Sequence, residues 1–281
     1  MPQARQPRRA KTGETVALTN NEEEQVRKRT GLRAAVVFES VRREGDVELG
    51  RSPLALAFSG LAAGLSMGFS LVVTGVLHTY LPDAPWRPLV ENFGYTVGFV
   101  IVVLGRQQLF TENTVTAVLP LLDDPQQGRT AVKAARLWAI VLAANLAGAT
   151  IFAYVLTHTP LFDPNVRASF AHLAREAIAP GFGAVLVRGI FAGWLIALMV
   201  WLLPVADAQK LWVVVIVTYV VGIASFSHIV AGSVDVLYGV ATGMIPATQY
   251  LADFLVPAFI GNSIGGILLV SLLNYGQVAP E

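Results

Sequence analysis

The sequence predicts an all-α membrane protein with six transmembrane helices, of which the second and the fifth are broken. Of the 281 residues, 54% are hydrophobic and only 14% are charged, whereas a soluble domain carries about 25% charged residues. Six long apolar segments follow a polar leader, at about 54–80, 89–121, 131–157, 183–203, 210–243 and 248–274. Because a spanning helix needs about 20 residues, the second and fifth segments have room for an interruption.

The polar leader divides the chain into a cytoplasmic tail, residues 1–50, and a transmembrane channel domain, residues 51–281. Residues 1–30 are rich in Arg, Lys, Glu and Gln, so we expect them to lack a fixed structure. Residues 31–50 carry apolar side chains at helical spacing, which predicts a short amphipathic helix. Two interpretations of this helix stay open. It either lies against the membrane surface or the underside of the channel, or it is a lead-in helix that is free in solvent.

The distribution of Lys and Arg predicts how the chain is oriented. Eleven of these residues precede the first span, and the loops after the second and fourth spans add others, such as Arg129 and Lys210. Because cytoplasmic segments carry the excess of positive charge, both termini are expected in the cytoplasm. The net charge of +1 gives no reason to expect a nucleic-acid partner, and the lack of cysteine excludes thiolate metal sites. We expect no cofactor.

The two interrupted spans indicate an internal, inverted repeat. Residues 110–112 (Phe-Thr-Glu) align with residues 226–228 (Phe-Ser-His) at an offset of 228 − 112 = 116. Asn145 and Asn262, each in the next span, align at an offset of 262 − 145 = 117. Two similar offsets predict a duplicated unit of about half the membrane domain. In transporters, paired interruptions of this kind mark a binding site near the middle of the membrane.

Five ionisable residues fall at membrane depth: Arg106, Glu112, Arg188, His228 and Asp235. A charge there costs about 2.5–3.5 kcal/mol on insertion scales, so it needs a partner or a cavity. For Arg106, Glu112 and Asp235 we expect ion pairs that hold the broken helices, with a field that selects the ion as the alternative. For His228 we predict a functional role, because it lies in the interruption and histidine titrates near neutral pH. Its expected role is to pass a proton to a weak-acid anion, as in proton-coupled transport, or to donate a hydrogen bond to the anion.

The remaining candidates surround these charges. We expect Leu109 and Phe226 to constrict a path through the protein, and the two repeated asparagines to brace the broken segments. The predicted pore or substrate residues are Leu109, Phe110, Thr111, Glu112, Phe226, His228 and Asp235. The predicted structural polar residues are Arg106, Asn113, Asn145, Arg188 and Asn262. No nucleophile motif or metal-ligand set is visible, so we predict no catalytic residue and no enzyme.

Several of these stretches resemble the formate/nitrite transporter family. Leu109-Phe110-Thr111 with Asn113 resembles the family's Leu-Phe-Thr loop in its broken second helix. His228, with the Val-Ala pair two residues on, resembles its His-x-Val-Ala-Asn segment. Residues 257–266 are similar to its sixth-helix pattern Pro-x-x-x-Gly-Asn-x-x-Gly-Gly. The resemblance covers about 50–275. Together with the long charged tail, these stretches resemble a less characterised inner-membrane branch of the family.

The resemblance implies an aquaporin-like protomer, a homopentamer in the lipid bilayer of the bacterial inner membrane, and permeation of small monovalent anions such as formate or nitrite past a central histidine. The chain departs from the family at Ser227, Gly232 and Gly193, where Glu, Asn and Asn are common. Two alternatives therefore stay open. Glu112 and Asp235 could make the pore selective for a cation or a neutral solute, or the protein is a non-transporting scaffold.

Overall fold

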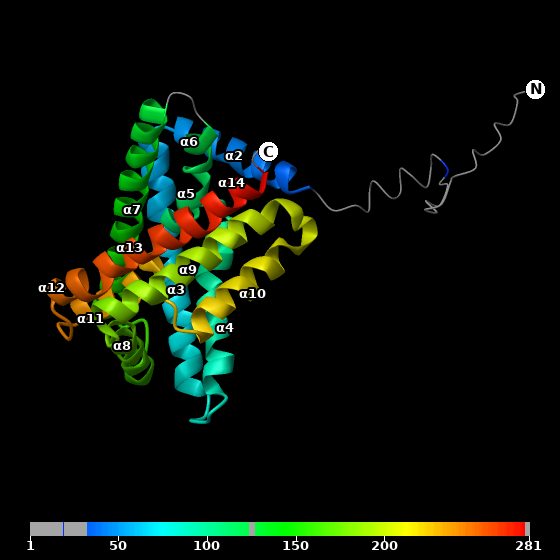
Figure 1. The fold of residues 1–281 in the computed structure, drawn as a ribbon. Coiled ribbons are helices and arrows are strands. Elements are labelled where there is room, and N and C mark those ends of the chain that lie inside the picture. The colour runs from blue at the N-terminus through cyan, green and yellow to red at the C-terminus, as the bar shows by residue number, and fades with distance from the viewer. Residues whose placement is uncertain (1–18, 20–32, 124–126, 279–281) are drawn as a thin grey trace, which may run out of the picture. The chain divides into compact units, whose positions relative to one another are not determined.

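The computed structural model describes residues 19, 33–123 and 127–278, so the predicted unstructured tail over 1–30 lies outside the described residues except for Thr19. Throughout the described part, the secondary structure is helical (Figure 1). The described residues from Ala34 onward form one compact unit. The α-helices are α2 (Ala34–Gly50), α3 (Pro53–Tyr80), α4 (Arg87–Leu104), α5 (Phe110–Thr116), α6 (Leu119–Asp123), α7 (Gln127–His158), α8 (Pro164–Ile178), α9 (Gly181–Leu202), α10 (Lys210–Ile223), α11 (Ile229–Ala241), α12 (Ala247–Gln249), α13 (Val256–Ile264) and α14 (Leu273–Val278). Short 3₁₀ and π-helical pieces join them at η1 (Leu203–Val205), η2 (Asp207–Gln209), η3 (Tyr250–Leu255) and η4 (Gly265–Leu272).

Five described helical segments are long and apolar enough to cross a membrane. They are Pro53–Tyr80, Arg87–Leu104, Gly128–His158, Gly181–Val205 and Ala247–Gln277. The predicted fifth span, 210–243, is in two pieces, α10 with 14 residues and α11 with 13. At about 1.5 Å per residue each piece is about 20 Å long, which is short of the roughly 30 Å of hydrocarbon in a bilayer.

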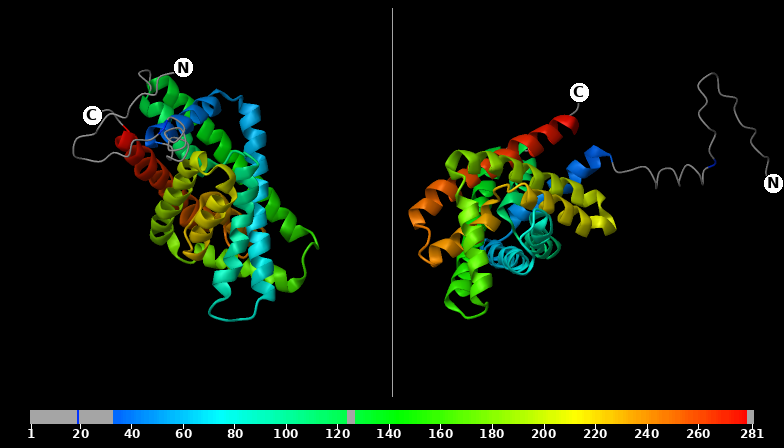
Figure 2. Two further views of the ribbon diagram at one scale, coloured as in Figure 1. Left: turned by 90° about the vertical axis from the view of Figure 1, so that its right-hand side faces the viewer. Right: turned by 90° about the horizontal axis from the view of Figure 1, so that it is seen from below.

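Glycines let the long helices pack at close range. α3 runs alongside α4 (Figure 2) and also packs against α7, whereas α9 packs against α13. A Cβ added at Gly64 of α3 would lie 2.1 Å from the backbone oxygen of Asn145, and one at Gly193 of α9 would lie 2.3 Å from that of Asn262. Such small-residue contacts are typical of membrane helices. They bring each asparagine against a neighbouring long helix.

The predicted amphipathic helix is α2, and it is packed against the other helices rather than free in solvent. Figure 1 shows it at one end of the molecule, beside α5 and α14. Phe38 contacts the rings of Trp201 and Tyr275, and Val41 is fully buried. A Cβ at Gly45 would collide with the backbone of α5. α2 therefore belongs to the same compact unit as the spans.

Candidate functional site

Two non-helical segments interrupt the apolar helices, and their backbones pass through the same conformations. Between α4 and α5, Arg106 has φ of 51° and Leu109 is extended. Between α10 and α11, Ser225 has φ of 51° and His228 is extended. Both pairs are related by the same offset, 225 − 106 = 228 − 109 = 119 residues. Leu109 and His228 therefore occupy matching backbone positions, each directly before a helix begins.

Asn145 of α7 holds the first of these segments. Its Oδ1 accepts a hydrogen bond from the Phe110 N–H at 3.0 Å, and its Nδ2 donates to the backbone oxygens of Gln108 at 2.9 Å and Gly60 at 2.8 Å. The side chain is fully buried. Where the chain leaves the helical pattern inside an apolar region, its backbone groups need other partners. This amide supplies them.

Asn262 of α13 does the same for the second segment. Its Oδ1 accepts from the Ile229 N–H at 2.8 Å, and its Nδ2 donates to the backbone oxygens of Ser227 at 2.8 Å and Gly189 at 2.9 Å. The two sets of bonds match Phe110 with Ile229 and Gln108 with Ser227.

The sequence alignment of residue 112 with residue 228 was therefore wrong by three residues. The alignment matched Phe110-Thr111 with Phe226-Ser227, because both pairs are a phenylalanine followed by a hydroxyl residue. In the folded chain, the equivalent positions are fixed by the partners of the two asparagines, and these lie on other helices.

His228 lies where the two interrupted segments meet. It is 1% exposed, and its Nδ1 accepts a hydrogen bond from the Ala231 N–H at 3.1 Å. Its Nε2 lies 2.8 Å from Thr111 Oγ1. Because Nδ1 accepts, we assign the proton of the neutral ring to Nε2, which then donates to the threonine oxygen. Both ring nitrogens are thus engaged, one by α11 and one by α5.

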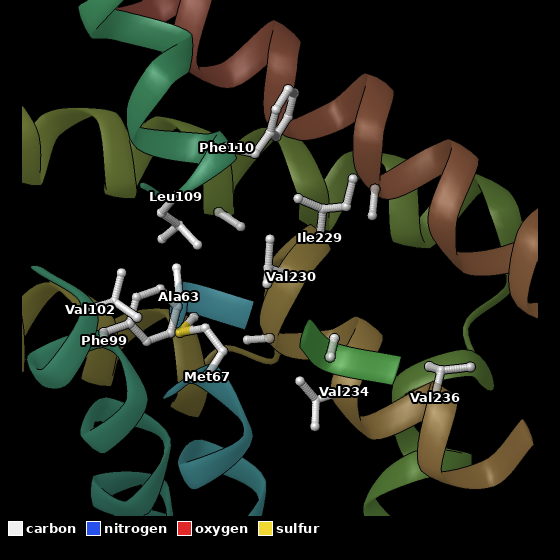
Figure 3. Packing of buried hydrophobic residues seen from close by; sticks show 14 of the residues in the cluster. Ala63, Met67, Phe99, Val102, Leu109, Phe110, Ile229, Val230, Val234 and Val236 are labelled. Carbon is white, nitrogen blue, oxygen red and sulfur yellow. The ribbon is translucent and has the colours of Figure 1, made fainter. Parts of the chain in front are cut away.

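Apolar side chains surround this meeting point. Figure 3 shows Leu109 gathered with Val102, Phe99 and Met67, opposite Val230. All of them are fully buried. The edge-to-face contact between Phe99 and His228 has a ring-centroid separation of 4.9 Å. A polar solute that passes His228 would leave water for this apolar surrounding.

The two predicted phenylalanines lie in different places. The ring of Phe110 points away from Leu109 (Figure 3) and is packed against Phe259 and Trp138. The ring of Phe226 is half-buried, stacks on Phe191 at 5.3 Å and lines a cavity. Leu109 and Phe110 are adjacent at the start of α5, yet their side chains point in different directions. The Leu-Phe-Thr motif alone does not reveal this difference.

The cavity has a volume of about 420 Å³ and reaches His228. Helices α3, α4, α8, α9, α10 and α11, the segments 179–180 and 225–228, and η3 contribute to its wall. Its polar and charged members are Ser70, Thr74, Glu91, Asn92, Tyr95, Glu176, Arg188, Ser225, Ser227, His228 and Asp235. The hydroxyl of Thr74 is buried without a hydrogen-bond partner among the described residues.

Ion pairs were expected for Arg106, Glu112 and Asp235, and within the described residues only Arg106 forms one, with neither of the other two. Arg106 pairs instead with Glu44 of α2 at 2.5 Å. Glu112 is half-buried, and its Oε1 has no hydrogen-bond partner within the described ranges. In that same part of the chain, neither Asp235 nor Arg188 has an ion-pair partner within 4.0 Å. The prediction of an ion pair is confirmed for Arg106 and wrong for Glu112 and Asp235. The carboxylate that pairs with Arg106 comes from α2, and this long-range contact leaves no local pattern.

A hydrogen-bond network between the first interruption and α2 was not predicted from the sequence. Gln108 Nε2 donates to Glu48 Oε2 at 2.6 Å, and Gln108 Oε1 accepts from Asn113 Nδ2 at 3.0 Å. Trp138 Nε1 donates to the backbone oxygen of Asn113 at 3.0 Å. The Gln-Gln pair in an apolar run was the available signal. Asn113 thus joins α5 to α7 directly and to α2 through Gln108.

Near the cavity, two carboxylates and two histidines lie close together. His78 Nδ1 is 2.9 Å from Glu91 Oε2, and His172 Nε2 is 3.2 Å from Glu176 Oε1. The rings of His78 and His172 stack at 4.8 Å. The described residues contain no group of three or more His, Asp or Glu arranged to hold a metal ion.

Comparison with known proteins gives consistent matches. A family model described as "Formate/nitrite transporter" matches residues 35–276. "Inner membrane protein YfdC" of Escherichia coli (strain K12) is 38% identical over 249 residues, which cover 89% of this chain and 80% of that protein. "Formate channel BtFdhC" of Bacillus thuringiensis is 29% identical over 222 residues, 76% of this chain and 82% of that one.

A solved structure, "Pentameric formate channel with formate bound", matches with a TM-score of 0.70 at 20% identity, and the match covers 80% of this chain and 97% of that chain. At this identity the match shows a shared fold.

Proposed function

Since this chain belongs to the formate/nitrite transporter family, we propose that it forms a membrane pore for a small monovalent anion, such as formate or nitrite, with His228 at its centre. The observation that carries the proposal is the hydrogen bond between His228 and Thr111. It joins the starts of α5 and α11, the two short helices that follow the interruptions. A permeating ion that passes between these helices meets this pair.

The proposal includes an architecture. Six spans, the second made of α4 and α5 and the fifth of α10 and α11, form an inverted repeat and an aquaporin-like protomer. The common offset of 119 residues and the matched bonds of the two asparagines support the repeat. The name of the pentameric formate channel supports a homopentamer, and that of the Escherichia coli relative supports the inner membrane. With both termini in the cytoplasm, the cavity faces outward; we name it the outer cavity.

The pair can lower the barrier for an anion in a specific way. Transfer of an ion out of water into an apolar surrounding is costly unless polar groups replace its hydration. Thr111 Oγ1 accepts from the imidazole, so its own hydrogen remains to be donated to the anion. The first N–H groups of α11 add positive potential at the same place. His228 thus orients a hydrogen-bond donor towards the path.

His228→Leu tests the proposal. Leucine is the side chain at the matching position 109, so the change is compatible with the backbone and with assembly. In proteoliposomes we expect this variant to lose uptake of labelled formate and nitrite while its elution on size exclusion stays that of the wild type. His158→Leu, which removes an exposed histidine at the end of α7, is the matched control. Unchanged uptake by the His228 variant would refute the central role.

A second candidate keeps the fold and changes the ion. Glu112 and Asp235 carry carboxylates on α5 and α11 without an ion-pair partner in the described part of the chain, and acidic groups along a pore favour cations. Single-channel recording under a sodium formate gradient separates the two. A reversal potential near the formate equilibrium value supports the anion pore, and one near the sodium value supports the cation pore.

A further inference from the structure

The hydrogen bonds of His228 limit what this residue can contribute. Its Nδ1 accepts from the backbone of α11, so a second proton on the ring would break a bond at the start of that helix. Its Nε2 is engaged by Thr111. The pair can therefore donate a hydrogen bond, but it holds no spare proton for the anion. If the substrate crosses the apolar surrounding as a neutral acid, another group has to supply the proton.

We propose that Asp235 is this group: it protonates the anion in the outer cavity before the anion passes His228. The inference rests on the proposed function and adds a residue and a step to it. Asp235 and His228 both line the outer cavity. His228 directly precedes α11, and Asp235 lies seven residues later in the body of this helix. At about 3.6 residues per turn, the two residues lie on one side of α11, about two turns apart. An incoming solute thus meets the aspartate first.

Asp235 differs from the other carboxyls of the outer cavity. Glu91 lies 2.9 Å from His78 Nδ1 and 3.7 Å from Arg87 Nε, and Glu176 lies 3.2 Å from His172 Nε2. Among the described cavity-lining carboxyls, Asp235 alone has no such partner. It is half-buried. Its carboxyl group is therefore available to a solute that enters the cavity.

The surroundings of Asp235 supply an anion-binding group. α9 contributes Arg188, which has no ion pair within the described residues. α4 contributes Glu91 and the phenol of Tyr95, and α8 contributes Glu176. α3, α10 and η3 contribute only uncharged residues to the wall, and α7 contributes none. Arg188 is therefore the one described guanidinium of the wall. It can attract the anion into the space that Asp235 faces.

The proton transfer is balanced within the cavity. The O–H bond of the Asp235 carboxyl breaks, and a new O–H bond forms on an oxygen of formate or nitrite, which gives the neutral acid and the aspartate carboxylate. The carboxylate regains a proton from hydronium in the outer solution, which leaves water. One anion and one proton then cross together, so the transport step moves no net charge.

Full-length protein in proteoliposomes, with a pH-sensitive dye inside, tests the step. Labelled formate uptake and internal acidification are measured together over external pH values from neutral to mildly acidic. We expect one proton per formate for the wild type. Asp235→Asn should lower uptake by about tenfold or more, because a positioned proton donor contributes at least that much, and should flatten its pH profile. Asp235→Glu should restore both. Asp253→Asn, a carboxyl outside the cavity wall, is the matched control.

Each outcome has a defined meaning. If the wild type moves formate and Asp235→Asn keeps its rate and pH profile, this inference fails and the proposed pore stands. If wild-type uptake carries no proton, the inference fails. This outcome does not depend on the variants, so it holds even where a variant does not assemble. If the wild type moves neither formate nor nitrite above empty vesicles, both proposals are overturned.

Discussion

Replacing Asn262 with alanine should destabilise the protein strongly, because one amide satisfies three buried backbone groups. Gly189 lies inside α9, so its carbonyl keeps a helical partner. The Ile229 N–H and the Ser227 oxygen lie outside regular helix pairing and lose theirs. An unsatisfied buried group costs about 1–3 kcal/mol, so the free energy of unfolding falls by about 2–6 kcal/mol. Tm falls by about 2–4 °C for each kcal/mol lost, so the smallest expected loss, about 2 kcal/mol, lowers Tm by about 4–8 °C.

Thermal unfolding of the purified protein in detergent, followed by tryptophan fluorescence, measures this change. Asn274→Ala is the matched control, because the Nδ2 of Asn274 is buried without a hydrogen-bond partner among the described residues. Its loss should change Tm by much less. If Asn262→Ala and Asn274→Ala give the same Tm, the bracing role assigned to Asn262 is wrong.

Two further predictions concern packing and pH. Gly193→Ala places a Cβ 2.3 Å from the backbone oxygen of Asn262 and should cost about 1–3 kcal/mol, whereas Gly183→Ala, with open space around it, should be neutral in the same unfolding assay. In α2, hydrogen bonds from Arg42 and the arginine after it lower the pKa of Glu39 from 4.5 to about 2. Its contribution to stability is therefore full above about pH 4.5 and lost as the pH falls through about 2. The difference between wild type and Glu39→Gln in hydrogen exchange of α2 should shrink towards zero over that interval, and a constant difference would contradict this account.

Hydropathy and polar interruptions carried most of what the sequence could predict. The apolar segments gave the positions of the long helices, and the polar residues from Arg106 to Asn113 marked where α4 stops at Leu104 and α5 starts at Phe110. The family resemblance was confirmed by the comparisons. These signals are local, since each depends on residues that are neighbours in the chain.

The rest depended on contacts between distant residues. Two asparagines, one on α7 and one on α13, set which residue is extended before α5 and before α11. The sequence alignment compared only side-chain types, so its register was wrong. The partner of Arg106 comes from α2, which the sequence left between two positions. Neither contact follows from periodicity or composition, because both require the helices to be packed first.

The matching of Leu109 with His228 separates fold from function at the centre of the protein. Both residues are extended, both precede a short helix, and an asparagine braces each segment. Leu109 makes no side-chain hydrogen bond to the helix that follows it. The backbone arrangement therefore does not require a polar side chain at this position. In the proposed function, the imidazole of His228 acts through Thr111 and the outer cavity, so its removal should change transport more than assembly.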